Sequence, residues 1–376
     1  MKTLVLFIDA LRMDYITKEN TPFLYSLKQK YNAHFLKQPF GYTSIGASFF
    51  TGQNPGKHKQ LTLYTYSKKG SLFKRLFYSK SCFYFYNLYN YFLGNDFFIP
   101  KIKNFYQFAP TIKKYYHHKN SLPCKTLLNI FNEKKVKYLV YNWPLIVHNN
   151  KTKLKIVRHN DNSITKVFLK LCKKDYKFYM VHLLDLDKYG HDCGPNSKKI
   201  REVLKKEDEC IERLTKKFDL NKDLIIIWSD HGMLEVNENI NLERILPKGR
   251  NYVYFLDSTL ARFWFFNNKI KNEIISILKN QKGRMLSEKD FNKYKIPKGY
   301  GDLIFLIKKN KAITPDFFNK NPVKGMHGYG LTNKNELGVL IINKKIKKSP
   351  YVIDLFPTIL KLMKIKYHKV DGSSLV

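Results

Sequence analysis

The chain has 376 residues, which exceeds the size at which single hydrophobic cores usually stop growing. Because 44% of its residues are hydrophobic, it can bury a large core. Its formal net charge is +38, yet 59 of its 68 basic residues are lysine. Because arginine suits bidentate contacts with phosphates and bases, this composition argues against a dedicated nucleic-acid partner and favours a lysine-coated surface.

Five cysteines, an odd number without a Cys-x-x-Cys pair, argue against a disulfide framework and indicate a reducing compartment. The apolar run at residues 4–8 is too short for the core of a signal peptide, and no stretch approaches the roughly 18 apolar residues of a membrane span. We therefore expect a cytoplasmic protein without a transmembrane segment. Composition leaves the oligomeric state open.

The chain begins with a predicted strand at residues 3–9, TLVLFID, which ends in Asp9. Short runs of large apolar residues bounded by polar groups are typical of strands buried inside a parallel sheet. A helix is predicted over residues 22–31, because Thr21 can cap it and Pro22 suits its first position.

Residues 39–58, PFGYTSIGASFFTGQNPGKH, predict a turn followed by a short helix. Gly41 permits the turn, Thr43 and Ser44 stand at the helix N-terminus, and the helix should end near Gly52. A hydroxyl in that place faces the positive end of the helix dipole, which favours a bound phosphate and a deprotonated oxygen alike. The alternative is that Thr43 is only a capping residue.

Residues 59–123 are rich in Tyr, Phe and Lys, and the most aromatic part lies at 83–92. We interpret this region as an insertion that either packs onto the main domain or offers a stacking surface for bases. A predicted helix at 124–132 and strand at 136–144 then resume the alternation of helices and strands.

Residues 178–195, FYMVHLLDLDKYGHDCGP, combine a buried strand with candidate metal ligands. The strand ends in Asp185 and Asp187, and His191 follows four residues after Asp187. On a turn or a first helical turn, that spacing lets a carboxylate and an imidazole converge on one cation. An amphipathic helix is predicted over residues 197–217.

Residues 224–233, LIIIWSDHGM, predict another buried strand, which ends in Asp230 and His231. A carboxylate beside an imidazole is half of a divalent-metal site, and open α/β sheets bind ligands beyond the carboxyl ends of their strands. A second insertion is predicted over 235–323, with strands at 251–257, 261–266 and 302–307 and a helix near 269–279.

Residues 324–330, KGMHGYG, place His327 between two glycines in a segment that cannot be a regular helix. A histidine in such a loop either faces solvent or binds a ligand. The chain closes with a predicted strand at 338–343 and a predicted helix at 351–363.

Seven residues at the ends of these elements supply what a two-metal phosphoryl-transfer centre needs: Asp9, Thr43, Asp187, His191, Asp230, His231 and His327. Carboxylates and imidazoles suit zinc, and two cations about 3.5–4 Å apart can bind both the attacking and the leaving oxygen. A hydroxyl on one metal becomes a nucleophile near neutral pH.

With these elements the chain resembles the alkaline phosphatase superfamily, in its type I phosphodiesterase and nucleotide pyrophosphatase branch. The resemblance is carried by Asp9, the block at 39–58, NWP at 142–144, DKYGH at 187–191, SDHGM at 229–233, MHGYG at 326–330, and the closing DLFPTIL and DGSSL. It implies one catalytic α/β domain over residues 1–376. This domain would be a three-layer sandwich with a mostly parallel central sheet, helices on both faces and inserted cap segments.

The resemblance also implies two metal ions, with zinc expected and manganese as the alternative. One zinc would be held by Asp9, Asp230, His231 and the Thr43 oxygen, and the second by Asp187, His191 and His327. Thr43 would attack phosphorus and form a covalent phosphothreonine-type intermediate, which a zinc-bound hydroxide would then hydrolyse.

The implied activity is hydrolysis of phosphodiester or pyrophosphate bonds in a small phosphorylated substrate such as a nucleotide. Trp143, Asp257 and Arg262 are candidates for contact with that substrate, and a buried ion pair is the alternative role for the last two. The spacing between the nucleophile and the Thr-Gly pair at 51–52 is one residue shorter than is usual in the family, so Ser44 is the reserve nucleophile. Leu145 stands where nucleotide pyrophosphatases commonly have glycine.

Two other functions stay open. The chain could be a phosphomonoesterase or phosphomutase of the same superfamily, or a basic binding protein on an inactive scaffold. A sulfatase is disfavoured, because the chain has neither a Cys-x-Pro-x-Arg motif nor a cysteine at the nucleophile position.

Overall fold

A six-stranded, mostly parallel sheet forms the centre of the protein. The structure is a computed structural model that describes residues 1–67, 107–111, 116–143 and 160–376. The strand order is β2–β16–β7–β1–β6–β5. The strands are β1 (Thr3–Ile8), β2 (Ala33–Leu36), β5 (Tyr138–Tyr141), β6 (Phe178–Leu183), β7 (Leu224–Trp228) and β16 (Gly338–Ile342). Only β16 runs antiparallel to its neighbours, and all of these strands except β2 were predicted from the sequence.

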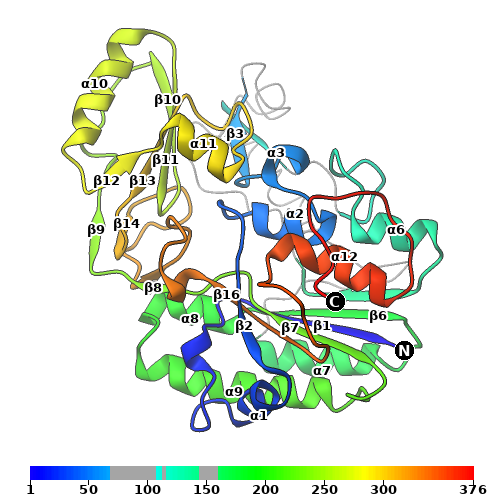
Figure 1. The fold of residues 1–376 in the computed structure, drawn as a ribbon. Coiled ribbons are helices and arrows are strands. Elements are labelled where there is room, and N and C mark those ends of the chain that lie inside the picture. The colour runs from blue at the N-terminus through cyan, green and yellow to red at the C-terminus, as the bar shows by residue number, and fades with distance from the viewer. Residues whose placement is uncertain (68–106, 112–115, 144–159) are drawn as a thin grey trace, which may run out of the picture.

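Helices cover both faces of the sheet, which gives the three layers visible in Figure 1. One face carries α2 (Ser44–Thr51), α6 (Leu127–Glu133) and α12 (Val352–Leu362). The other carries α1 (Pro22–Tyr31), α7 (Asp161–Leu171), α8 (Asp185–Cys193) and α9 (Lys198–Thr215). The predicted α/β sandwich is therefore confirmed.

The apolar run of β1 is continuous because the strand is buried on both sides. Val5 and Phe7 pack into the core beneath α2 and α12, whereas Leu4, Leu6 and Ile8 pack into the core beside α1 and α9. Successive side chains of a strand point to opposite faces, so a central strand of a three-layer fold must be apolar at every position.

A smaller lobe lies within the segment predicted as the second insertion. Its antiparallel sheet has the order β10–β11–β13–β12 and packs against α10, around Phe263 and Phe305. The elements of this lobe and its borders are β8 (Leu234–Glu235), β9 (Glu238–Ile240), β10 (Tyr252–Leu256), β11 (Leu260–Phe265), α10 (Asn268–Lys279), β12 (Gly283–Met285), α11 (Glu288–Tyr294), β13 (Leu303–Ile307), β14 (Lys311–Ile313) and β15 (Gly325–Met326).

Only parts of the segment predicted as the first insertion can be described. The antiparallel pair of β3 (Tyr64–Tyr66) and β4 (Phe108–Pro110) packs on the smaller lobe, where Phe108 contacts Phe255 and Trp264. The aromatic run at 83–92 lies outside the described residues. The described residues also form three short helices: α3 (Pro55–His58), η1 (Met13–Tyr15) and η3 (Lys334–Glu336).

Two expectations from composition can be compared with the described chain. Cys124, Cys172, Cys193 and Cys210 are free thiols, and Cys82 lies outside the described residues. Among the described residues, no helix is both long and apolar enough to cross a membrane.

The start of α1 is capped differently from the prediction. The Thr21 hydroxyl donates to the carbonyl of Tyr15, 3.0 Å away, instead of accepting from the helix. The N–H groups of Phe23 and Leu24 donate to the carboxylate of Asp208 on α9, at 2.8 and 2.9 Å. The cap comes from a distant helix, so local sequence could not reveal it.

Replacing that distant cap should destabilise the protein. Asp208→Ala leaves two helix N–H groups without their acceptor, and we expect the free energy of unfolding to fall by about 1–2 kcal/mol in urea denaturation. Lys205→Ala, on the exposed side of the same helix, is the control and should change stability by less than about 0.5 kcal/mol. Equal effects of the two substitutions would contradict the capping role.

Candidate metal centre

The parallel order of three central strands brings their carboxyl ends to one edge of the sheet. Ile8 pairs with Leu183 of β6, and Phe7 pairs with Trp228 of β7. The residues that follow these strands therefore emerge side by side, at the edge where α/β sheets bind ligands. They include Asp9, Asp187 and Asp230.

Asp9, Asp230 and His231 form the first group, in which one ligand atom from each residue lies within 4.8 Å of the others. Nε2 of His231 is 3.4 Å from Oδ1 of Asp9 and 3.3 Å from Oδ2 of Asp230. Nδ1 of His231 donates to the carbonyl of Gly232 at 3.0 Å. A carbonyl can only accept, so in the neutral ring the lone pair lies on Nε2, directed at the two carboxylates.

Asp187, His191 and His327 form the second group, again with ligand atoms within 4.8 Å of one another. Asp187 and His191 are four residues apart on α8, so both point from one helix face. Nε2 of His191 is 3.2 Å and Nε2 of His327 is 3.7 Å from Oδ1 of Asp187. Nδ1 of His191 donates to the carbonyl of Gly325 at 2.9 Å, which fixes the orientation of the ring.

The two groups touch through a pair of stacked imidazoles. The rings of His231 and His327 are nearly parallel, and their centroids are 3.5 Å apart. Burial, together with the neighbouring His231, lowers the pKa of His327 well below its usual value. His327 is therefore a neutral imidazole, the form that binds metals.

Crowding and burial of the carboxylates shift the protonation of the centre. Burial raises the pKa of Asp9 to about 7 and that of Asp230 to about 8, and neighbouring carboxylates add to both shifts. Burial would also raise the pKa of Asp187, but His191 outweighs it and holds that pKa below the usual range. Burial alone would lower the pKa of His191, yet the charge of Asp187 raises it to about 9.

Two buried carboxylate oxygens give an independent reason to expect divalent cations at these residues. Oδ1 of Asp9 and Oδ1 of Asp187 are buried and make no hydrogen bond. Each oxygen instead faces a ring nitrogen, Nε2 of His231 at 3.4 Å and Nε2 of His191 at 3.2 Å, and a cation held between oxygen and nitrogen would satisfy both while relieving the repulsion between the carboxylates. Each group thus offers the oxygen and nitrogen donors that zinc prefers.

The two candidate hydroxyl nucleophiles have different surroundings. Ser44 is fully buried, and its hydroxyl bonds to the carbonyls of Phe40 and Gly41, each at 2.6 Å. The hydroxyl of Thr43 has no hydrogen bond and does not cap α2. Of the two hydroxyls, that of Thr43 is therefore the unengaged one, and that of Ser44 has a structural role in the turn.

The residues beside Thr43 contact His327 and Trp143. The edge of the Tyr42 ring faces His327, with centroids 5.5 Å apart. On the other side, Gly46 lies against the indole of Trp143, since a Cβ at Gly46 would come within 2.8 Å of it. The start of α2 consequently packs against the centre.

His182 belongs to this site, although the sequence analysis did not single it out. Its Nε2 lies 2.9 Å from Oδ2 of Asp9, and its ring stacks on Phe7 with centroids 4.2 Å apart. By engaging Oδ2, His182 leaves Oδ1 of Asp9 facing His231. A histidine inside an otherwise apolar strand was the available signal, but its partner lies on the neighbouring strand.

The structure favours structural roles for the candidate substrate contacts. Asp257 and Arg262 form a buried ion pair at 3.1 Å, and Arg262 also donates to the carbonyl of Tyr64 at 2.8 Å. A buried ion pair was the alternative role for these two residues in the sequence analysis. Because both side chains are buried, neither is accessible to a substrate. Trp143 is 5% exposed, and its ring centroid lies 5.3 Å from that of His182, so the indole packs against the histidine that contacts Asp9. Leu145 lies outside the described residues.

Comparisons with solved structures identify the same architecture. Murine ectonucleotide pyrophosphatase/phosphodiesterase 5 matches with a TM-score of 0.72 and 15% identity, covering 99% of this chain and 98% of that one. An inactive threonine-to-alanine variant of the murine protein, in complex with AMP, matches with a TM-score of 0.70 and 14% identity, covering 99% and 97%. The human protein gives 0.69 and 16%, again covering 99% and 97%.

The sequence itself gives a family assignment. No curated protein sequence matches the chain significantly. A family model described as type I phosphodiesterase/nucleotide pyrophosphatase matches residues 3–329, which include every candidate ligand of both groups. The chain therefore belongs to the type I phosphodiesterase/nucleotide pyrophosphatase family and is a phosphoric ester hydrolase, as its sequence motifs predicted.

Proposed function

We propose that the protein hydrolyses phosphodiester or pyrophosphate bonds of a nucleotide-like substrate, using two divalent metal ions and Thr43 as the nucleophile. The observation that carries this proposal is the pairing of two three-residue ligand groups with one unengaged hydroxyl at a helix N-terminus. The AMP bound by the structurally similar murine protein supports a nucleotide as substrate.

Asp9, Asp230 and His231 would hold one ion, and Asp187, His191 and His327 the other. The mixture of imidazoles and carboxylates favours zinc over manganese, which takes more oxygen ligands. Divalent cations in these positions stabilise negative charge on phosphoryl oxygens and lower the pKa of a neighbouring hydroxyl or water.

The residues of the chain would supply the covalent chemistry. The Thr43 oxygen attacks phosphorus and forms a phosphoester bond, while the bond to the leaving oxygen breaks and that oxygen gains a proton. Water then attacks the same phosphorus and releases Thr43 with its proton restored. The second step regenerates the enzyme without a redox change or another cofactor.

The N-terminus of α2 would stabilise the charge that develops on the phosphoryl group. The N–H groups of Ser44, Ile45 and Gly46 open the helix, and none donates to a backbone carbonyl among the described residues. Such free N–H groups, together with the helix dipole, bind anionic oxygens.

Two adjacent substitutions test the choice of nucleophile. Thr43→Ala should lower kcat on a p-nitrophenyl nucleotide diester by at least about a thousandfold. Ser44→Ala removes a donor to two carbonyls, so it should cost about 1 kcal/mol of stability while retaining activity within about tenfold. Loss of activity only in Ser44→Ala would move the nucleophile by one residue. Faster hydrolysis of p-nitrophenyl phosphate would point to a phosphomonoesterase.

Metal stoichiometry tests the two ligand groups. The wild type should bind two equivalents of zinc in equilibrium dialysis, and Asp187→Asn should bind one tightly, because it lacks the carboxylate shared by both histidines of its group. Asp192→Asn, an exposed position on the same helix, is the matched control and should bind two. Binding of two equivalents by all three proteins would contradict the assignment.

Zinc affinity should rise with pH between about 6 and 9. Asp9, Asp230 and His191 hold protons up to pKa values of about 7, 8 and 9, and a cation must displace those protons. Competition with a chromogenic chelator at several pH values measures the change, and proton release on adding zinc gives a second readout. An affinity that does not change with pH would show that these groups are not displaced by the metal.

A further inference from the structure

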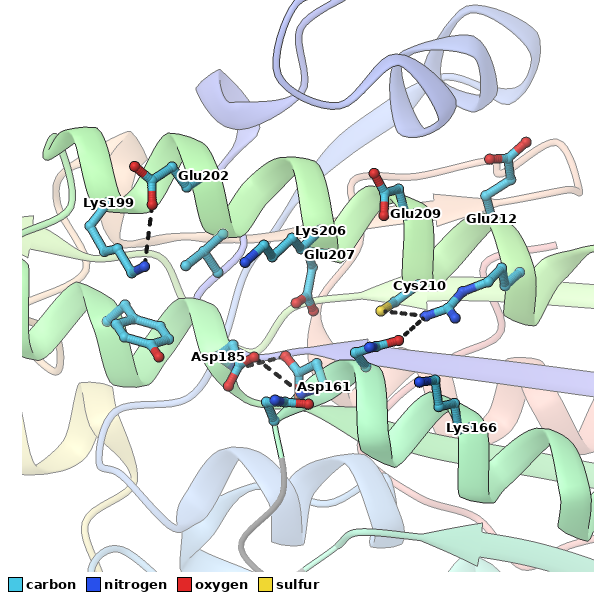
Figure 2. A pocket seen from close by; sticks show the side chains of 15 residues that line it. Asp161, Lys166, Asp185, Lys199, Glu202, Lys206, Glu207, Glu209, Cys210 and Glu212 are labelled. Atoms are coloured by element: carbon cyan, nitrogen blue, oxygen red, sulfur yellow. Dashed lines mark hydrogen bonds and ion pairs between the residues drawn. The ribbon is translucent and has the colours of Figure 1, made fainter.

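A second group of buried carboxyls lies outside the candidate metal centre. A cavity of about 650 Å³ separates α7, α8 and α9, and Figure 2 shows Asp161, Asp185 and Glu207 pointing toward one another within it. Asp161 and Glu207 are each only 2% exposed. Neither belongs to the metal-ligand groups, so the proposed reaction leaves them without a role.

Asp161 caps a helix to which it does not belong. The N-cap residue of α8 is Leu184, whose side chain has no hydrogen-bonding atom. The carboxylate of Asp161 instead accepts from the N–H of Leu184 at 2.9 and 3.0 Å and from the N–H of Asp185 at 2.7 Å. In return, Asp185 accepts from the N–H of Asp161 at 3.1 Å. The starts of α7 and α8 are thereby locked together.

This lock bears on the metal centre through α8. The helix starts at Asp185 and carries two candidate ligands within its next two turns, Asp187 and His191. The carboxylate oxygen of Asp187 must meet His327 from a different segment, so a shift of the helix start would change the ligand geometry. Ligand distances in metal sites tolerate deviations of only about 0.2 Å.

Glu207 enters from α9 and faces Asp161 (Figure 2). Neither residue forms an ion pair with lysine or arginine among the described residues, and Oε1 of Glu207 is buried and accepts no hydrogen bond from an N–H or O–H donor. Two adjacent buried carboxyls cannot both ionise without a large cost. Because Asp161 already accepts backbone N–H groups, which favour its charged form, the shared proton belongs on Glu207.

The pKa shifts of the pair agree with this assignment. Burial, and next the charge of Asp161, raises the pKa of Glu207 well above its usual value. Burial raises the pKa of Asp161 to about 6, and its hydrogen bond with Glu207 opposes that rise. Of the other ionisable groups, Asp185 from α8 and Cys210 from α9 itself add to the rise in the pKa of Glu207. The remaining ionisable groups that line the cavity are Lys166 from α7, Tyr189 from α8, and Lys199, Glu202, Lys206, Glu209, Glu212 and Arg213 from α9.

We propose that Glu207 is a positioning residue for the metal centre: as a neutral carboxylic acid it donates a hydrogen bond to Asp161, which fixes the start of α8 and hence Asp187 and His191. The inference about the ligands rests on the proposed function. The hydrogen bond and the helix lock do not, and they can be tested in zinc-free protein.

The test compares Glu207→Gln, Glu207→Ala and the wild type. Glutamine keeps an N–H donor for Asp161 but cannot ionise, whereas alanine removes the donor. Glu209→Gln is the matched control, because it removes one carboxyl from the exposed side of the same helix and cavity. Hydrogen–deuterium exchange of the α8 start in zinc-free protein reports on the lock directly. We expect at least tenfold faster exchange in Glu207→Ala and unchanged exchange in Glu207→Gln and Glu209→Gln.

The pH dependence of stability gives a readout that packing alone would not move. The native wild type keeps a proton on Glu207 that the unfolded chain releases above its ordinary pKa, so the stability of the wild type should fall as pH rises from about 5. Glu207→Gln lacks this loss, so the difference between its melting temperature and that of the wild type should grow in favour of the variant as the pH rises above about 5. A constant difference between the two proteins across this range would overturn the proposal.

Zinc binding tests the consequence for the metal centre. The affinity for the more weakly bound zinc ion should fall by about ten- to a hundredfold in Glu207→Ala, which is the usual cost of losing a residue that positions metal ligands. In Glu207→Gln the affinity should return to that of the wild type. A wild type that binds no zinc would refute the proposed function, while the exchange and pH experiments would still decide the lock. Ca²⁺ should not stabilise the zinc-free wild type. If Ca²⁺ stabilised the zinc-free wild type but not Glu207→Gln, the carboxyl pair would be a cation site, and the proposal would be overturned.

Discussion

Three carboxylates at one sheet edge impose the main physical constraint on this structure. Asp9 and Asp230 follow the adjacent parallel strands β1 and β7, and Asp187 lies in the first turn of α8, which follows β6. The topology that buries the core therefore also brings their carboxylates together. Such a cluster is stable only when protons or cations neutralise it. The imidazoles of His191, His231 and His327 lie within 3.7 Å of these carboxylates, so that nitrogen and oxygen donors face one another across the cluster.

The surrounding layers hold this cluster rigidly. Phe7 of β1 lies between His182 and Trp228, and Trp228 in turn stacks on Phe49 of α2. The aromatic packing thus connects the strand that ends in Asp9 with the helix that begins beside Thr43. Supporting groups that fix the orientation of ligands are as much a part of a metal site as the ligands themselves.

The sequence predicted much of the fold and the composition of the site, because both depend on local patterns. Apolar runs marked the buried strands β1, β6 and β7, and polar residues at their ends marked Asp9, Asp187 and Asp230 as candidates. What the sequence could not reveal depends on distant partners. Asp208 caps α1 and Asp161 caps α8 from other helices. The burial of Arg262 beside Asp257 likewise required the smaller lobe to be folded.

The stacked rings of His231 and His327 belong to different ligand groups, and this gives the centre a property that neither group has alone. With centroids 3.5 Å apart, the two rings share one local potential, so a change of charge on one alters the energy of the other. Protonation of the two rings is therefore thermodynamically linked: a positive charge on one ring opposes a positive charge on the other. By reciprocity this linkage works equally in both directions, so the two imidazoles exchange protons with solvent as one coupled pair and not as two independent groups.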